Sequence, residues 1–361
     1  MGHRLYLRPT AFVDAPFGYD GQVLRLAGGL CFFSQIELIE VRDNARVRQT
    51  LLPVEALESH INSLPTEMAE QAKRVIGNLT RPRAPLKVGP RNIPLDQPQV
   101  MGILNVTPDS FSDGGAHADP AGLALDMLRN GAALIDVGGE STRPGAKPVW
   151  EGDEIARVEP VVRMLAAGGA AVSIDTRKAG VMEVALDAGA GLVNDVSALS
   201  WDDRALGVVA ARGCPVVLMH HQGNPETMQH DPQYNDVLIE VYDWLDARIE
   251  TAVAAGVDRA NILIDPGIGF GKTLRHNLAI LNGLSLFHGL GCPIVLGASR
   301  KRSIGALSGE APADQRLGGS VALATLGAAQ GVQMLRVHDV FETVQALRVW
   351  RGLRDEALSP V

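Results

Sequence analysis

The chain has 361 residues, enough for one large domain with a smaller attachment. Hydrophobic residues make up 46% and charged residues 20%, a globular balance that excludes a disordered chain. The net charge of −8 argues against bulk binding to nucleic acid or to an anionic membrane, because both require a basic surface. A small anionic substrate is still compatible with this composition, since an acidic protein can contain a local basic pocket.

The cysteines and the start of the chain indicate the compartment. Cys31, Cys214 and Cys292 are scattered and form no C-x-x-C pair. This usage is typical of a reducing compartment and not of a disulfide framework or a zinc site. The start lacks a long apolar segment, and no stretch approaches about 18 uninterrupted apolar residues. We therefore expect a cytoplasmic protein that binds neither membranes nor nucleic acid.

The first part of the chain, residues 1–96, predicts a small α/β extension. Apolar runs predict strands over 22–26 and 30–41, and helical spacing predicts a helix from about residue 54 to 75. Four prolines in the two stretches 80–85 and 92–98 predict a linker around residues 80–98. Because we find no catalytic constellation before the linker, we expect an extension that packs or forms oligomers, with a second activity as the alternative.

Eight short apolar runs follow the linker, most of them separated by stretches with helical spacing. The runs lie at 100–106, 133–137, 171–174, 191–193, 215–219, 261–264, 293–296 and 333–337. Continuously apolar strands are buried on both faces, as in a parallel sheet covered by helices. Eight strand–helix units match the ~250 residues of a (β/α)8 barrel. We therefore predict an α/β protein with a catalytic TIM barrel over 97–361, and a doubly wound open sheet is the alternative.

Polar residues lie near the ends of these runs or shortly after them. They include Asn105, Asp136, Asp175, Asn194, His220, Asp265, Lys301, Arg336 and His338. Taken singly, an Asp or Asn in such a place caps the next helix about as often as it serves a ligand. In a barrel, however, the carboxyl ends of all strands meet at one mouth, where active sites lie. Unpaired acids are costly to bury there, so their convergence predicts a binding site.

One set of these side chains suits a heteroaromatic ring. Asp175, Asn194 and Asp265 provide acceptors and an amide, and Lys301 provides a donor. A 2-amino-4-oxo-pteridine offers the complementary N–H edge and ring acceptors, and charge-assisted hydrogen bonds of this kind contribute roughly 1.5–3 kcal/mol each. A purine would satisfy the same groups.

A second set suits a diphosphate with Mg²⁺. It contains an amide that can bind a hard cation, two arginines and a histidine, namely Asn105, Arg143, Arg336 and His338. The sequence therefore predicts a ligand that carries both a bicyclic ring and a phosphorylated tail.

Two long motifs identify a family. MGILNVTPDSFSDGG at 101–115 and GGESTRPG at 138–145 resemble the signature stretches of dihydropteroate synthases. Further motifs follow in the family's order at 173–176, 193–195, 218–220, 265–272, 297–301 and 336–339. The resemblance covers roughly residues 97–352. One departure is His221, where the family commonly has Met, and we expect little effect because this position neighbours the pocket without contacting its centre.

The resemblance implies a TIM-barrel transferase of folate synthesis and assigns the site residue by residue. The pterin-binding residues would be Asp175, Asn194, Asp265, Lys301, Arg336 and Met219. The diphosphate-binding residues would be Asn105, Arg143, Arg336 and His338, with Asn105 also binding Mg²⁺ as the metal ligand. The p-aminobenzoate-binding residues would be Thr142, Pro144, Phe270, Ser299 and Phe111. The catalytic residues would be Arg336, His338, Lys301 and Asn105.

The implied reaction joins (7,8-dihydropterin-6-yl)methyl diphosphate to p-aminobenzoate, and sulfonamides compete in the family. The arylamine is neutral at pH 7, so the absence of an obvious nucleophile with a base is expected. We expect a dissociative substitution by a homodimer. The alternatives are a pterin-dependent methyltransferase barrel, which has no use for a diphosphate clamp, and a non-catalytic pterin-binding paralogue, which would typically have lost residues such as Asn105 or His338.

Overall fold

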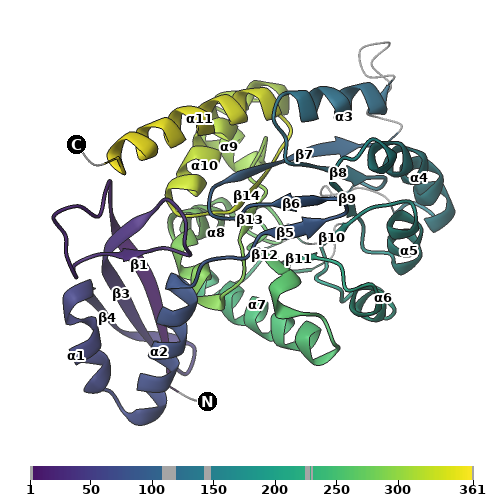
Figure 1. The fold of residues 1–361 in the computed structure, drawn as a ribbon. Coiled ribbons are helices and arrows are strands. Elements are labelled where there is room, and N and C mark those ends of the chain that lie inside the picture. The colour runs from purple at the N-terminus through teal and green to yellow at the C-terminus, as the bar shows by residue number, and fades with distance from the viewer. Residues whose placement is uncertain (1–2, 108–118, 142–147, 224–227, 229–230, 360–361) are drawn as a thin grey trace.

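A computed structural model describes residues 3–107, 119–141, 148–223, 228 and 231–359. Eight parallel strands form its centre (Figure 1). They are hydrogen-bonded in the order β12-β11-β10-β9-β8-β7-β14-β13, and a bridge between Ile264 and Ile294 joins the two ends. The strands are β7 (Gln99–Asn105), β8 (Leu134–Gly138), β9 (Val172–Asp175), β10 (Leu192–Asp195), β11 (Val216–Met219), β12 (Ile262–Asp265), β13 (Val295–Leu296) and β14 (Met334–Val337). The predicted barrel is confirmed, and the open-sheet alternative is wrong.

Helices surround the strands (Figure 1). They are α3 (Pro120–Arg129), α4 (Glu151–Ala167), α5 (Ala179–Asp187), α6 (Ala205–Arg212), α7 (Val237–Ala254), α8 (Leu274–Asn282), α9 (Arg302–Leu307), α10 (Leu317–Ala329) and α11 (Val340–Ala357). Every residue of β9, β10, β11 and β12 is buried, because helices cover one face and the barrel interior covers the other. Among the helices that the structure describes, none has both the length and the apolar character needed to cross a membrane.

The extension is a four-stranded antiparallel sheet with two helices on one face. Its elements are β1 (Arg4–Val13), β2 (Leu24–Arg25), β3 (Phe32–Arg42), β4 (Ala45–Pro53), α1 (Leu57–Asn62) and α2 (Thr66–Thr80). β2 is a short stretch beside the start of the central strand β3. The predicted strands correspond to β2 and β3, whereas β1 and β4 were missed. Both are edge strands, and β4 is largely exposed and polar, so neither has the apolar run that marks a barrel strand.

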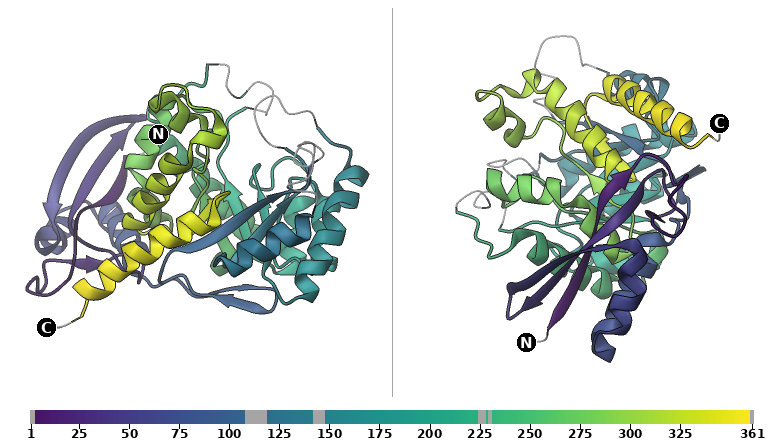
Figure 2. Two further views of the ribbon diagram at one scale, coloured as in Figure 1. Left: turned by 90° about the horizontal axis from the view of Figure 1, so that it is seen from above. Right: turned by 90° about the vertical axis from the view of Figure 1, so that its left-hand side faces the viewer.

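The extension lies against one flank of the barrel, beside the end of α11 (Figure 2). There the Arg354 guanidinium donates to Asp14 at 2.5 Å. On the barrel side of the sheet, the Tyr6 hydroxyl donates to Asp243 of α7 at 2.7 Å, and Ser285 Oγ donates to the Pro9 carbonyl at 2.8 Å. The extension also has its own hydrophobic core around buried Phe33 and its neighbours. It is thus folded and attached to the barrel by polar and apolar contacts.

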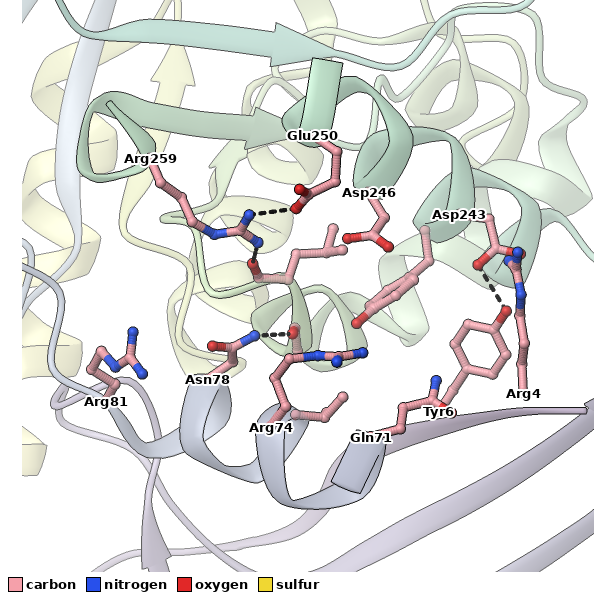
Figure 3. A pocket seen from close by; sticks show the side chains of 14 residues that line it. Arg4, Tyr6, Gln71, Arg74, Asn78, Arg81, Asp243, Asp246, Glu250 and Arg259 are labelled. Atoms are coloured by element: carbon pink, nitrogen blue, oxygen red, sulfur yellow. Dashed lines mark hydrogen bonds and ion pairs between the residues drawn. The ribbon is translucent and has the colours of Figure 1, made fainter. Parts of the chain in front are cut away.

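A groove of about 700 Å³ runs along this junction, between α2 and α7 (Figure 3). Asn78 donates to the Gly289 carbonyl at 2.8 Å across it, and Arg259 pairs with Glu250 at 2.7 Å on the barrel side. The residues that line the groove include none of the predicted pterin or diphosphate ligands. This groove therefore lies apart from the predicted site.

The predicted linker forms a hairpin that covers the amino end of the barrel. β5 (Leu86–Val88) pairs antiparallel with β6 (Arg91–Ile93). Buried apolar side chains of the hairpin pack against the barrel strands, in a cluster that includes Leu86, Val88, Ile93, Leu95, Met101, Leu134, Ala171, Leu192, Val217, Leu263, Val295 and Met334. The two strands of the hairpin are only three residues long and lie among prolines. Their apolar pattern was therefore too short to predict strands, and the sequence indicated only a linker.

Candidate active site

Four side chains at the carboxyl ends of β8, β9, β10 and β14 form one hydrogen-bonded network. Arg336 Nε donates to Asp136 Oδ2, and Arg336 Nη2 donates to Asp175 Oδ2, each at 2.6 Å. Asn194 Nδ2 donates to the same Asp136 oxygen at 2.9 Å. Residues up to 200 positions apart therefore meet at one end of the barrel, as the strand register predicts.

The network holds two buried carboxylates around one guanidinium. Asp136 is 1% exposed and Asp175 is 7% exposed. Burial raises the pKa of Asp175, and the attraction of Arg336 only partly offsets this rise. Burial lowers the pKa of Arg336, but the carboxylates of Asp136 and Asp175 outweigh it, so the net shift is upward. The guanidinium is thereby kept charged at the mouth of the barrel.

Each carboxylate also has an oxygen without a partner. Oδ1 of Asp136 and Oδ1 of Asp175 are buried and accept no hydrogen bond within the described part of the chain. A buried unsatisfied acceptor costs roughly 1–3 kcal/mol, so each one calls for a specific explanation. A ligand with N–H groups on its edge would supply the missing donors.

A third carboxylate ends β12, and a lysine lies on the loop after β13. Asp265 is paired in register with Met219 of β11, and its Oδ1 accepts the Gly267 N–H at 2.7 Å. Burial raises the pKa of Asp265, although the Gly267 N–H and Lys301 lower it. Lys301 Nζ lies 4.1 Å from the centre of the Phe270 ring, in a cation–π contact. The predicted pterin set and one aryl-side residue thus come together.

Three members of the predicted diphosphate set lie on β7 and at the end of β14, namely Asn105, Arg336 and His338. His338 follows β14, and its Nδ1 lies 3.1 Å from Ser299 Oγ, which also accepts the His338 backbone N–H at 3.2 Å. Asn105 ends β7, half-buried and paired with Gly138 of β8. Ser299 was predicted on the p-aminobenzoate side, and in the structure it stands against His338.

Four predicted site residues lie outside the described residues. They are Phe111, Thr142, Arg143 and Pro144. Their roles stay predictions. His221, the departure from the family pattern, is described: its Nδ1 lies 2.9 Å from the Gly223 carbonyl, on the loop after β11.

Sequence reasoning gave no role to two buried residues of the site. Asp136 stands inside an apolar run, and a charge in such a run was the signal that could have identified it. Lys272 is 2% exposed and lies on the loop after β12, at the end of the motif 265–272. Within the described ranges, no group of three or more His, Cys, Asp or Glu side chains could hold a metal by itself.

The carboxyl mouth of this TIM barrel holds buried carboxylates and an amide around one arginine. Such an arrangement is typical of an enzyme that binds a small polar ring. A family model described as "Pterin binding enzyme" matches residues 101–338. The dihydropteroate synthase of Neisseria meningitidis serogroup B is 46% identical over 276 residues, which cover 74% of this chain and 96% of that protein. The Escherichia coli K12 dihydropteroate synthase is 47% identical over 262 residues, 72% and 92% of the two chains. The chain belongs to the dihydropteroate synthase family of pterin-binding enzymes and is a transferase of folate biosynthesis.

Solved structures agree with this membership. Yersinia pestis dihydropteroate synthase in complex with a sulfonamide drug has a TM-score of 0.72 and 47% identity, covering 75% of this chain and 99% of its own. The Xanthomonas albilineans enzyme with 4-aminobenzoic acid has a TM-score of 0.71 and 47% identity, covering 75% and 98%. The same enzyme with 7,8-dihydropteroate has a TM-score of 0.68 and 44% identity, covering 75% and 98%. The prediction of the family is confirmed, and these relatives favour it over a methyltransferase barrel.

Proposed function

We propose that this enzyme condenses (7,8-dihydropterin-6-yl)methyl diphosphate with p-aminobenzoate, giving 7,8-dihydropteroate and diphosphate. The observation that carries the proposal is the set of buried acids at one mouth, with the Asp175 oxygen that lacks a partner. The related structures bind 4-aminobenzoic acid and 7,8-dihydropteroate. A pterin ring has the N–H edge that these acids require.

The ring would lie among the ends of β9, β10, β11 and β12. Asp175 would accept hydrogen bonds from the N–H edge, and Asn194 and Asp265 would hold the rest of that edge. Met219, which is buried, would pack on the ring, and Lys301 would donate to a ring acceptor. Because Asp175 already binds Arg336 through its other oxygen, the guanidinium would lie beside the ring and link it to the diphosphate.

The diphosphate would be bound by the second set. Ser299 Oγ accepts the His338 backbone N–H and lies 3.1 Å from Nδ1 of that ring, to which it would donate its own proton. In this tautomer Nε2 carries the proton and can donate to a phosphate oxygen. Arg336 and His338 would therefore stabilise the negative charge that develops on the leaving group. Arg143, outside the described residues, would add a second guanidinium.

The donor set fits a weakly held Mg²⁺. Asn105 offers one hard amide oxygen, and Mg²⁺ commonly takes few protein ligands together with substrate phosphates and water. Bound there, the ion would neutralise charge on the leaving diphosphate. The residues of the chain hold and orient the two substrates around it.

We infer a dissociative order of events, in which the C–O bond to the diphosphate breaks before the arylamine attacks. The amine is neutral at pH 7, so no side chain needs to act as a strong base. Phe270 and Ser299 would border the incoming ring, together with Thr142, Pro144 and Phe111. If single-turnover diphosphate loss is first order in p-aminobenzoate at all concentrations, this order is wrong.

The activity is tested by supplying the pterin diphosphate, p-aminobenzoate and Mg²⁺ and measuring 7,8-dihydropteroate by chromatography. We expect product only when both substrates are present, and much less product after chelation of the metal. His338→Ala and Arg336→Ala should mainly lower kcat, because their partner is the departing charge. Ligand binding without turnover by the wild-type chain would instead support a pterin-binding paralogue.

We also propose a homodimer in the cytoplasm. Adjacent helices α10 and α11 carry exposed apolar side chains, namely Leu326, Phe341, Val349 and Leu353, which are 55–64% exposed. A second copy would cover such a surface with its own identical surface. Light scattering should give twice the mass of the chain, and Leu353→Glu should shift it toward the monomer. A monomeric wild-type protein would contradict the proposal.

A further inference from the structure

The loop after β12 is built around a buried lysine. Lys272 Nζ lies 2.9 Å from the Gly267 carbonyl oxygen, 3.1 Å from the Phe270 carbonyl oxygen and 2.8 Å from Nδ1 of His220. Lysine is rarely buried without a charged partner. Here its short contacts are two carbonyls and a ring nitrogen, so its hydrogen bonds go to the backbone of one loop and to the end of β11.

Lys272 and His220 contact each other through a hydrogen bond between Nζ and Nδ1. Burial, with the repulsion of Lys272, lowers the pKa of His220 well below its usual range. The lowered pKa favours the neutral imidazole, whose Nδ1 can accept a hydrogen bond from Lys272 Nζ. The ring is fixed in turn by its edge contact with Trp244, with ring centres 4.9 Å apart. The histidine thus offers the lysine a rigid acceptor.

The loop lies so close to the end of β11 that it needs glycine at two positions. Gly267 has φ of +70°, and a Cβ there would lie 1.9 Å from the His220 carbonyl oxygen. Gly271 has φ of +62°, and a Cβ there would lie 2.3 Å from the Gln222 carbonyl oxygen. A loop of glycines is flexible by itself. Lys272 provides two of the hydrogen bonds that restrict it, beside those made by Asp265, Asn277 and Tyr234.

Phe270 is the side chain that this loop presents to the site. Its carbonyl is held by Lys272, and its ring lies 4.1 Å from Lys301 Nζ. The neighbouring Gly269 passes directly beneath the Lys301 side chain, since a Cβ there would lie 3.3 Å from Lys301 Cδ. The hydrogen bond from Lys272 to this carbonyl therefore helps to hold the Phe270 backbone, and with it the ring.

We propose that Lys272, together with His220, is a positioning residue that fixes the Phe270 loop for the arylamine substrate. It touches neither substrate and acts through the two carbonyls that it binds. This inference rests on the proposed function, in which Phe270 borders the p-aminobenzoate ring. Loss of Lys272 should thus weaken arylamine binding more than pterin binding, because Asp175 and Asn194 are held by a separate network.

The test compares Lys272→Met with wild type in steady-state kinetics with each substrate varied. We expect KM for p-aminobenzoate to rise at least about tenfold and KM for the pterin diphosphate to change less than about threefold. Lys272→Gln serves as a second variant, since its amide can still donate to the loop carbonyls and should give an intermediate rise. Arg83→Met is the matched control, because buried Arg83 also binds carbonyls, those of Asn78 and His288, but at the junction with the extension.

The control variant Arg83→Met should have a lower melting temperature than wild type and unchanged KM values for both substrates. An unchanged KM for p-aminobenzoate in folded Lys272→Met would overturn the inference, as would an equal rise in both KM values in Lys272→Met or Lys272→Gln. If the wild-type chain forms no dihydropteroate, the proposed function fails instead. Calorimetric binding of p-aminobenzoate in the presence of pterin and diphosphate then still measures the effect of Lys272 on the loop.

Discussion

Arg336 is the residue through which the two halves of the site are connected. Its guanidinium binds Asp136 and Asp175 at once, and Asp175 keeps one buried oxygen without a partner. A buried acceptor without a partner carries a free-energy penalty, and a hydrogen bond from the pterin edge would remove it.

Replacing Asp175 with Ala tests this at a single residue. We expect KM for the pterin diphosphate to rise at least about tenfold, because pterin donors lose their acceptor. KM for p-aminobenzoate should change much less. Asp243→Ala, which removes a carboxylate bound to Tyr6 at the junction with the extension, is the control and should affect stability only. A pterin KM within about twofold of wild type would contradict the assignment of Asp175.

Lys272 should also leave a signature in the pH dependence of stability. Burial lowers its pKa from 10.5 to about 7, so between these values the unfolded chain binds more protons than the folded one. The wild-type free energy of unfolding should therefore rise with pH across this window, relative to Lys272→Met. The groups that face the ammonium, His220 and Asp265, are present in both proteins. If the difference in free energy of unfolding between the two proteins does not vary with pH, the pKa of Lys272 is not lowered.

At the scale of elements, the barrel strands could be predicted because each is a continuous apolar run, and strand order then placed their polar ends together. Asp175, Asn194 and Asp265 were predicted for that reason. Asp136 was named at a strand end but given no role, and Lys272 was given none, because burial of a charge is decided by neighbours from other strands. The edge strands β1 and β4 and the hairpin of β5 and β6 were missed, since short or half-exposed strands have weak patterns.

The hairpin depends on close backbone approach at one glycine. A Cβ on Gly191, just before β10, would lie 2.1 Å from the Gly89 nitrogen. Gly191→Ala should therefore lower the free energy of unfolding by ~1–3 kcal/mol, as overpacking does. Gly207→Ala in α6 meets nothing within 4 Å and should raise it by ~0.5–1 kcal/mol. Equal chemical denaturation midpoints for Gly191→Ala and wild type would contradict the close packing of the hairpin.

At the scale of the molecule, the extension is the part that the family comparison does not reach. The family model begins at residue 101, whereas Tyr6, Ile39 and Val41 already belong to the same hydrophobic core as the barrel. The extension thus shares a core with the catalytic domain as well as having its own.

Deletion of residues 1–80 should therefore expose apolar surface on the barrel flank. We expect a lower melting temperature and reduced solubility, with KM values for both substrates unchanged in the fraction that stays folded. Differential scanning calorimetry and steady-state kinetics measure the two effects. An unchanged melting temperature would contradict the packing role, and loss of activity in a stable truncated protein would point to a direct role in the reaction.

The position of the pterin ring in the barrel mouth is measured directly by a crystal structure of the full chain with a pterin diphosphate analogue. We expect the ring between Asp175 and Asp265, with Asp175 Oδ1 accepting a ring N–H and the phosphates beside Arg336 and His338. A ring bound elsewhere, for example in the groove between α2 and α7, with these side chains left without contact to the ligand, would contradict it.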